Sequence, residues 1–287
     1  MLVKDILAVD VGATKLAAAR VTSDGVIKKR SSTPTESRNG EELFRKLISL
    51  SEEVLDGTEV DGCGVGSAGP MRNNGEEISP LNIPQWRNFP LRSKLSEALG
   101  IPVALDNDAK AIALGEGWVG AASGHKNYLA MVVSTGIGGG FVIDGKLLDG
   151  EMGNAGHIGH INVEPDGPMC ACGSNGCLEA VASGGAIEKE TGMPATEASE
   201  EVKIRCGYFV GKAVSIAVNL LNIPTVLIGG SVALGFGPIF LNQVRSTAAS
   251  FCGLDFTKNL QVNFASLKDE APLIGAAAVW LNTKGVN

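Results

Sequence analysis

The sequence predicts an α/β protein made of two similar halves. Strand-like runs alternate with helical runs along most of its 287 residues. Two β-hairpins of one design, each closed by a glycine-containing turn that carries a Thr, begin at Ile6 and at Tyr128. Two such hairpins favour a duplicated domain, and the cleft between the copies is the natural place for a ligand. A chain of this length can bury a full core.

The first half begins with the apolar run Ile6–Val11, a glycine turn and a second apolar run over Leu16–Val21. A turn at Ser23–Gly25 leads into Val26–Lys29, which completes three consecutive strands. Further along this half we expect a helix over 40–55, a strand over 60–68, a helix over 91–99, a strand over 102–105 and a helix from 107 to about 119.

The second half repeats this opening with a strand over Tyr128–Val133, a turn over Ser134–Gly140 and a returning strand over Phe141–Ile143. Asp144–Gly145 predicts the next hairpin turn. The segment Gly150–Ala182 is typical of a loop. Beyond it we expect a polar, mobile stretch over 188–201, a helix over 203–221, a strand over 225–228 and a helix over 273–281.

Composition narrows the class of protein. Lys and Arg number 24 against 31 Asp and Glu, which gives a net charge of −7, and no basic run of five or more residues is present. A nucleic-acid-binding surface is therefore not expected. No apolar run reaches the ~20 residues that cross a bilayer, and Met1–Asp10 lacks the pattern of a signal peptide. We expect a soluble, cytoplasmic protein.

The first hairpin turn has the pattern D-x-G-x-T-K. Gly12 allows the backbone to approach a phosphate, Thr14 and Lys15 offer a hydroxyl and a cation, and Asp10 can hold Mg²⁺ through water. The alternative is an ordinary β-turn. The second turn, Ser134–Gly140, favours a phosphate grip divided between two hairpins, and it is not a P-loop because G-x-x-x-x-G-K-[ST] is absent.

A second motif combines one imidazole with three thiols: His160, Cys170, Cys172 and Cys177. This Cys₃His set suffices for a tetrahedral zinc shell, and a closed shell indicates a structural site. A disulfide or a trio of free thiols is the alternative, which close spacing and a cytosolic setting disfavour. The remaining cysteines stand alone in apolar surroundings and are expected to be buried: Cys63, Cys206 and Cys252.

The triplet Asp106-Asn107-Asp108 supplies a candidate general base. Phosphoryl transfer to an alcohol needs a carboxylate within reach of the hydroxyl proton, and Asn107 can bond a neighbouring sugar hydroxyl. Asp108 lies near a helix N-terminus, which favours the charged carboxylate. Helix capping is the alternative explanation of this triplet.

These motifs occur together in one order: the D-x-G-x-T-K hairpin, Asn107-Asp108-Ala109, Ser134–Gly140, Gly159-His160 and the stretch 170–179. This series resembles the ROK family, named for repressors, open reading frames and kinases, over nearly the whole chain. Gly69-Pro70 and Leu81-Asn82-Ile83 look like that family's sugar-facing loops, and Ile228-Gly229-Gly230 looks like its adenosine-side loop.

The resemblance implies an actin-like ATPase (ribonuclease H-like) fold, with two α/β domains closing over ATP and a hexose. The expected domains are residues 1–115 with 273–287, and the larger 116–272, which carries the zinc loop. Asp108 would be the general base, usually toward O6 of the sugar. The implied sugar-binding residues are Gly69, Asn82, Asn107, Asp108, His157, His160 and Glu179. The implied residues for Mg-ATP are Asp10, Gly12, Thr14, Lys15, Thr135, Gly136, Gly138, Gly139, Gly229 and Gly230.

In one position the sequence departs from the family pattern. Many sugar kinases of the family read G-E-x-G-H, whereas this chain reads Gly156-His157-Ile158-Gly159-His160. A histidine cannot supply the two acceptor oxygens of a glutamate. Glucose is the first candidate substrate, and N-acetylmannosamine, N-acetylglucosamine, mannose, fructose or allose are alternatives, as is polyphosphate in place of ATP.

Two other functions are possible on the same fold. A repressor of the family carries a helix-turn-helix region before the first hairpin, and the strand that begins by Ile6 leaves no room for one. A sugar-binding protein without kinase activity is disfavoured because Asp10, Thr14, Lys15 and Asp108 are all present. The resemblance also implies a homodimer.

Overall fold

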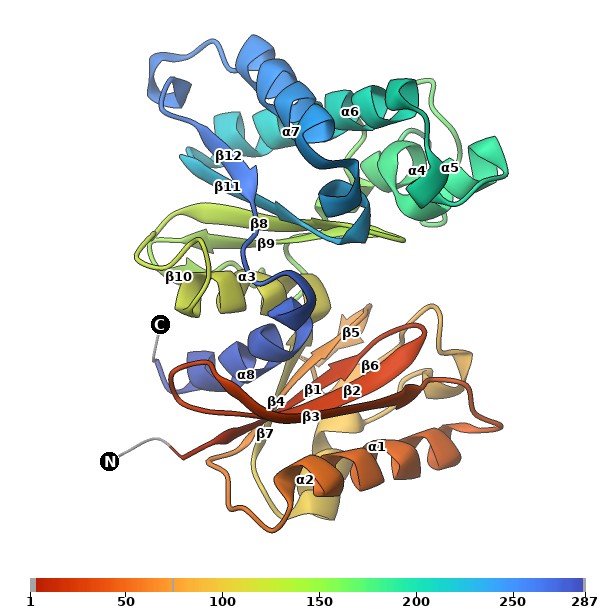
Figure 1. Cartoon of the computed structure of the whole chain (residues 1–287), viewed down its shortest axis with the longest axis vertical. Helices are drawn as coiled ribbons and strands as arrows, with labels where there is room; N and C mark the ends of the chain where they lie inside the picture. The colour runs from red at the N-terminus through yellow and green to blue at the C-terminus, as the bar shows by residue number, and fades with distance from the viewer. Residues whose placement is uncertain (1–3, 74, 286–287) are drawn as a thin grey trace. The chain divides into compact units, whose positions relative to one another are not determined.

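The computed structural model describes residues 4–73 and 75–285 and divides into two α/β units (Figure 1). The first unit comprises the chain up to Ser123, the segment Leu147–Ala155 and the chain from Asp269 onward. The second unit comprises Gly124–Lys146 and Gly156–Lys268. The expected mixed α/β fold is confirmed. Of the expected segments, Met1–Val3 and the last two residues lie outside the described part of the chain.

The first unit contains a five-stranded sheet in the order β3-β2-β1-β4-β7. The pairs β1–β2 and β2–β3 are antiparallel, whereas β1–β4 and β4–β7 are parallel. The parallel register aligns Asp10 with Gly66 and Gly66 with Asp106, so the acidic residues of two motifs lie in one row across the sheet. The strands are β1 (Ile6–Val11), β2 (Lys15–Val21), β3 (Ile27–Pro34), β4 (Cys63–Ser67) and β7 (Val103–Asn107).

Helices cover both faces of this sheet. In Figure 1, α1 (Gly40–Leu55) and α2 (Leu91–Leu99) lie below the sheet, and α3 (Asp108–Trp118) and α8 (Ala271–Thr283) lie above it. Strand β4 meets α8 so closely that a Cβ on Gly64 would lie 1.8 Å from the carbonyl oxygen of Ala276, which only glycine tolerates. Short elements fill the β4–α2 connection: β5 (Met71–Arg72), β6 (Glu77–Ile78) and the 3₁₀ turn Pro84–Trp86.

The second unit repeats the topology. Its sheet has the order β10-β9-β8-β11-β12, in which the β8–β9 hairpin is antiparallel and β8–β11 and β11–β12 are parallel. An equivalent order of strands in both units supports the duplication that the two hairpins predict. The strands are β8 (Tyr128–Val133), β9 (Ile137–Ile143), β10 (Lys146–Leu147), β11 (Thr225–Gly229) and β12 (Gln261–Phe264).

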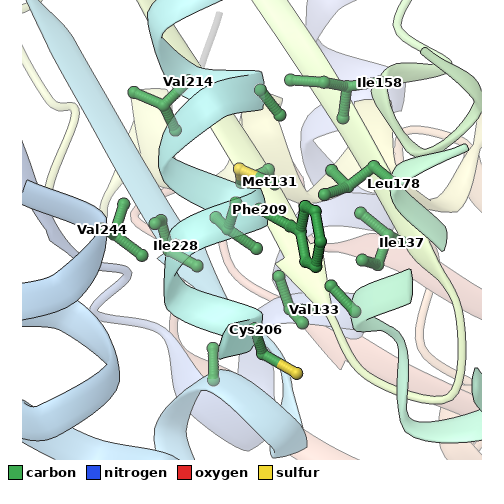
Figure 2. Close-up of a cluster of buried hydrophobic side chains, with 14 of the residues drawn as sticks. Met131, Val133, Ile137, Ile158, Leu178, Cys206, Phe209, Val214, Ile228 and Val244 are labelled. Carbon is green, nitrogen blue, oxygen red and sulfur yellow. The ribbon is translucent and has the colours of Figure 1, made fainter. Parts of the chain in front are cut away.

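The core of the second unit forms where two long helices, α6 (Glu200–Leu221) and α7 (Ser231–Phe251), pack on its sheet. Figure 2 shows Phe209 of α6 at its centre, with Ile137, Ile158 and Leu178 gathered on one side of the ring. These three belong to β9, to a 3₁₀ turn (Ile158–His160) and to α4 (Leu178–Ala182). The cluster therefore ties the loop region to the sheet. The remaining elements are α5 (Gly184–Thr191) and the 3₁₀ turns 195–197, 255–257 and 268–270.

Most predicted elements are found within a few residues of their expected bounds. The expected turn over Ser134–Gly140 is shorter, because β9 begins at Ile137 and three of its glycines lie within the strand. The stretch 188–201 is not an extended loop: it holds the end of α5, a 3₁₀ turn and the start of α6. The long helix α7 was not predicted, and it is kinked at Gly237-Pro238, where Gly237 has φ 66°.

Among the described residues, α6 alone is long and apolar enough to cross a membrane. Its most apolar window is 56% buried inside the protein, and the buried helix of a protein core passes the same test. This is weak evidence for a membrane span.

Candidate active site

Hydrogen bonds of the backbone fix the conformation of the first hairpin turn. The N–H of Gly12 donates to the carbonyl of Lys15 over 3.1 Å, and a Cβ on Gly12 would lie 2.9 Å from that oxygen. Thr35 fastens the turn from outside, since its hydroxyl donates to the Gly12 carbonyl and its N–H donates to the Thr14 carbonyl. Thr14 and Lys15 are exposed. The turn thus presents a hydroxyl and an amine on a fixed backbone.

Asp10 lies in a charged neighbourhood within the first unit. Burial and, to a lesser degree, the charge of Asp108 raise the pKa of its carboxyl, and Lys15 lowers it, so that the pKa is about 7. Desolvation and a nearby like charge both disfavour a second negative charge. The structure therefore brings together three predicted residues, Asp10, Lys15 and Asp108. A carboxylate with a raised pKa beside a second carboxylate is a setting that a divalent cation relieves.

Asp108 opens helix α3 at the end of strand β7. The Asn107 side chain caps the helix, accepting from the N–H groups of Ala109 over 3.0 Å and Lys110 over 3.4 Å. Asp108 accepts from Ala109 over 2.8 Å. Capping, the alternative explanation of this triplet, is therefore real, and it fixes both side chains at a strand end. Neither role excludes substrate binding, since each carboxylate or amide oxygen accepts more than one bond.

The two predicted sugar-facing loops of the first unit differ in their relation to Asn107. A Cβ on Gly69, which precedes Pro70 through a cis peptide bond, would lie 3.8 Å from the Asn107 amide nitrogen. Gly69 is thus a neighbour of Asn107. Asn82 is exposed, and its loop is supported by Arg87, whose guanidinium donates to the carbonyls of Ser79 and Pro80.

The second hairpin turn is held by residues of its own unit. Glu179 of α4 accepts from the N–H of Ile137 over 2.8 Å, and a Cβ on Gly136 would lie 2.8 Å from the same carboxylate oxygen. Ser134 shares a 2.9 Å hydrogen bond with the hydroxyl of Ser231. Gly139 is buried in β9, where packing alone explains a glycine. Thr135, at the tip of the turn, is exposed.

A pocket of about 260 Å³ opens beside this turn, entirely within the second unit. Its lining joins Thr135 to the N-terminus of α5 and the first turns of α7. Gly230, which links β11 to α7, has φ 95° and approaches the Val133 backbone so closely that a side chain could not be placed there. Of the residues that line the pocket, sequence analysis identified Thr135 and missed several others: Gly184, Gly185, Glu188, Ser231 and Phe236. The sequence contains one signal for these residues: Ser183-Gly184-Gly185 has the pattern of a helix start, with Ser183 as the N-cap of α5.

The four predicted metal ligands converge. One ligand atom from each of His160, Cys170, Cys172 and Cys177 lies within 4.8 Å of the others. Cys170 Sγ lies 3.6 Å from His160 Nδ1, and Cys172 Sγ lies 3.6 Å from Cys177 Sγ. Ligands about 2.3 Å from a tetrahedral zinc would be about 3.7 Å apart, so the donor set fits that ion. A hydrogen bond with the Ser174 backbone lowers the pKa of Cys172 to about 7, which favours the thiolate.

The loop that carries these ligands is folded by glycine turns. Gly173, at φ 92°, closes the Cys170–Ser174 turn, and Gly176, at φ 67°, lies so close to Glu164 that a Cβ would meet its carbonyl oxygen at 1.6 Å. His157 and His160 are exposed at the two sides of a 3₁₀ turn, with ring centroids 5.9 Å apart. The candidate metal site and both histidines therefore share one short segment.

Comparisons with known proteins place the chain in a family. The model of the ROK family matches residues 6–283. The chain belongs to the ROK family. It is 34% identical to a glucokinase of Thermotoga maritima, with 96% of each chain covered, and 34% identical to an N-acetylmannosamine kinase of Citrobacter koseri, covering 94% of this chain and 97% of that one. A ROK family glucokinase from Streptomyces griseus, solved with glucose and AMPPNP, superposes with a TM-score of 0.83 at 29% identity, covering 95% and 98%. These relatives confirm the expected actin-like ATPase fold.

Proposed function

We propose that this ROK family protein is an ATP-dependent sugar kinase that transfers a phosphoryl group to a hexose hydroxyl, with glucose as the first candidate. One observation carries the proposal: Asp108 opens helix α3 where its charge acts on Asp10, and Asp10 lies in a hairpin with an exposed Lys15. A carboxylate that can act as base toward the acceptor alcohol and a second carboxylate that can bind a cation for the donor thus lie near one another in one unit. The family's named kinases and the glucose–AMPPNP complex of a relative point the same way.

In this proposal Asp108 draws the proton from the attacking sugar hydroxyl. A helix N-terminus favours the charged form of a carboxylate, and the charged form is the one that can accept that proton. Asn107 precedes Asp108 and Gly69 lies beside Asn107, and both would contact neighbouring hydroxyls. On the second unit His157, His160 and Glu179, and on the first Asn82, would complete the sugar contacts.

The donor would be Mg-ATP. Gly12, Thr14 and Lys15 would contact the phosphates from the first hairpin, and Thr135 with Gly136, Gly138 and Gly139 from the second. Gly229 and Gly230, which precede the pocket-lining Ser231 in the chain, would border the nucleoside. Mg²⁺, when bound, would neutralise charge on the transferred phosphoryl group, and Asp10 would hold it through water.

Zinc would be structural. The Cys₃His shell leaves no open position for a substrate, so the ion would order the loop that carries His157 and His160 rather than take part in the chemistry. Metal analysis of purified protein should find about one zinc per chain. Metal-free protein with an ordered loop and full sugar affinity would contradict this assignment.

We also propose that the protein is a cytoplasmic homodimer. Four apolar side chains of α6 are between 38% and 77% exposed: Ile204, Tyr208, Ile216 and Leu220. Ile204 and Tyr208 are four residues apart, as are Ile216 and Leu220, so each pair is adjacent on the helix surface, and exposed apolar side chains favour a partner. Sedimentation at working concentration tests this, and a monomer would contradict it.

The kinase assignment is tested by coupled ADP release with Mg-ATP over a panel of hexoses and N-acetylhexosamines. Glucose and N-acetylmannosamine are the substrates in the names of the two curated relatives reported above, and His157 departs from the G-E-x-G-H pattern, so the panel decides between these sugars. Asp108→Asn should lower the turnover number about a hundredfold or more, while sugar binding persists. A variant that turns over normally would remove Asp108 from the role of base.

A further inference from the structure

Lys110 is a buried lysine that the proposed chemistry does not use. It lies two residues beyond Asp108, in the first turn of α3, and its side chain is only 2% exposed. Its ammonium lies 2.7 Å from Asp106 Oδ1, 2.6 Å from Asp149 Oδ1 and 3.1 Å from the carbonyl oxygen of Gly153. Three oxygens thus match the three hydrogens of the ammonium. A buried charge is tolerated only with such full pairing.

Two of these oxygens belong to the segment Leu147–Ala155, which we term the strap. The strap is part of the first unit, although the residues before and after it in the chain belong to the second. Apart from Leu147 at the end of β10, it contains no helix or strand. Side-chain contacts must therefore hold it, and Lys110 supplies two. Asn154 supplies another, bonding the N–H and the carbonyl of Met71.

The strap is closed into a loop by its own backbone. The N–H of Ala155 donates to the Asp149 carbonyl over 2.9 Å. Asp149, whose side chain pairs with Lys110, therefore also holds the last residue of the strap through its backbone. The next residue, Gly156, begins the segment that carries His157 and His160. On its other side, Lys110 pairs with Asp106, whose carboxylate accepts from the Asn107 N–H over 2.7 Å. The Lys110 ammonium thus links two places in the backbone. Through Asp106 it reaches Asn107, the residue before the candidate base, and through Asp149 it reaches Ala155, the residue before Gly156.

We propose that Lys110 is a positioning residue for sugar phosphorylation: it clamps the strap to α3 and so sets the backbone from which Asp108 and His157 project. This inference rests on the proposed function and deepens it. The hairpins assigned to ATP lie outside the clamp, since none of the three oxygens bound by Lys110 belongs to them. Loss of the clamp should therefore weaken sugar binding and leave ATP binding unchanged.

The test removes one of the two strap oxygens that bind Lys110, the Asp149 carboxylate, and spares the pair that Lys110 forms with Asp106. Asp149 is 56% exposed, so Asp149→Ala should fold, whereas Lys110→Met leaves Asp106 buried without a cation and risks misfolding. The matched control is Glu151→Ala, on the same strap; like Asp149, Glu151 lines a cavity that Asp106 and Lys110 also line. Within residues 4–73 and 75–285, the Glu151 side chain makes no hydrogen bond or ion pair.

With the sugar that the wild type phosphorylates, Asp149→Ala should raise the sugar KM about tenfold, the loss expected for about 1.4 kcal/mol of binding. The KM for ATP should stay within about twofold, and Glu151→Ala should match the wild type. Hydrogen exchange of the amides of 150–155 should accelerate in Asp149→Ala alone. An unchanged sugar KM would overturn the proposal, even if the variant unfolds more easily, because that result describes a merely structural contact.

A wild type that phosphorylates no sugar of the panel would instead count against the proposed function. Hydrogen exchange then decides on Lys110 by itself. Exchange of the strap that is equal in the wild type and Asp149→Ala would show that the clamp does not order the strap, and it would overturn the inference.

Discussion

The raised pKa of Asp10 predicts how the stability of the first unit depends on pH. Its pKa rises from 3.8 to about 7 on folding, first through burial and then through the charge of Asp108. The folded chain therefore keeps a proton that the unfolded chain releases above about pH 4. This stabilisation is fully present below pH 3.8 and is lost as the pH rises through 7. A shift of about three units corresponds to ~4 kcal/mol.

Asp10→Asn tests this prediction, because an amide copies the neutral carboxyl and cannot ionise. The free energy of unfolding of the wild type, minus that of the variant, should fall by up to ~4 kcal/mol between about pH 4 and pH 8. Denaturant unfolding in magnesium-free buffer, followed by tryptophan fluorescence, measures it. All three tryptophans of the chain, Trp86, Trp118 and Trp280, belong to the first unit, so the signal reports on the unit that contains Asp10.

A second variant separates the two causes of the shift. Asp108→Asn removes the neighbouring charge but not the burial, so the pH-dependent loss should shrink without disappearing. Magnesium competes with the proton, and it should raise the unfolding midpoint of the wild type more at pH 8 than at pH 6. Parallel pH curves for the wild type and Asp10→Asn would refute the reasoning, because they would mean that Asp10 is already ionised at low pH.

Three further predictions concern the second unit. Cys172→Ser should lower bound zinc from about one per chain to a small fraction, measured by elemental analysis, because it breaks the Cys₃His shell. Gly176→Ala should destabilise the zinc loop by ~2 kcal/mol or more, because the added Cβ meets the Glu164 carbonyl. Faster hydrogen exchange and a lower melting temperature would measure this loss. The control is Gly192→Ala, which also has a positive φ of 71° but has open space around it. Glu179→Ala should speed exchange of the Ile137 amide at least tenfold and raise the KM for ATP, and an unchanged amide would contradict this.

The elements that sequence analysis predicted are those with strong local signals. Helix α1 follows from apolar residues at helical spacing and begins and ends where expected, at Gly40 and Leu55. The hairpins follow from apolar runs around glycine turns. The Cys₃His cluster follows from spacing and residue type alone, because few other arrangements use one imidazole and three thiols.

The parts that were not predicted depend on contacts between distant residues. Nothing in Leu147–Ala155 indicates that this segment belongs to the first unit, because the ion pair with Lys110 and the bonds from Asn154 decide it. The glycines of β9 read as a turn because a glycine run has no strand propensity, and only pairing with β8 keeps them extended. The lining of the pocket in the second unit comes from two helix starts that are far apart in the sequence.

The duplicated fold accounts for the backbone of both hairpins but not for their side chains. Each turn spans three residues, 12–14 between β1 and β2 and 134–136 between β8 and β9. At the equivalent strand positions the first hairpin has Asp10 and Lys15, where the second has Val132 and Ile137. The charges that can meet magnesium and phosphate are therefore present in one copy only. The second copy is apolar at those positions, and Ile137 instead packs beside Phe209 while its amide is held by Glu179 (Figure 2). In the proposed kinase, the first hairpin would therefore contact the reacting phosphate, and the second would hold the nucleotide by its backbone.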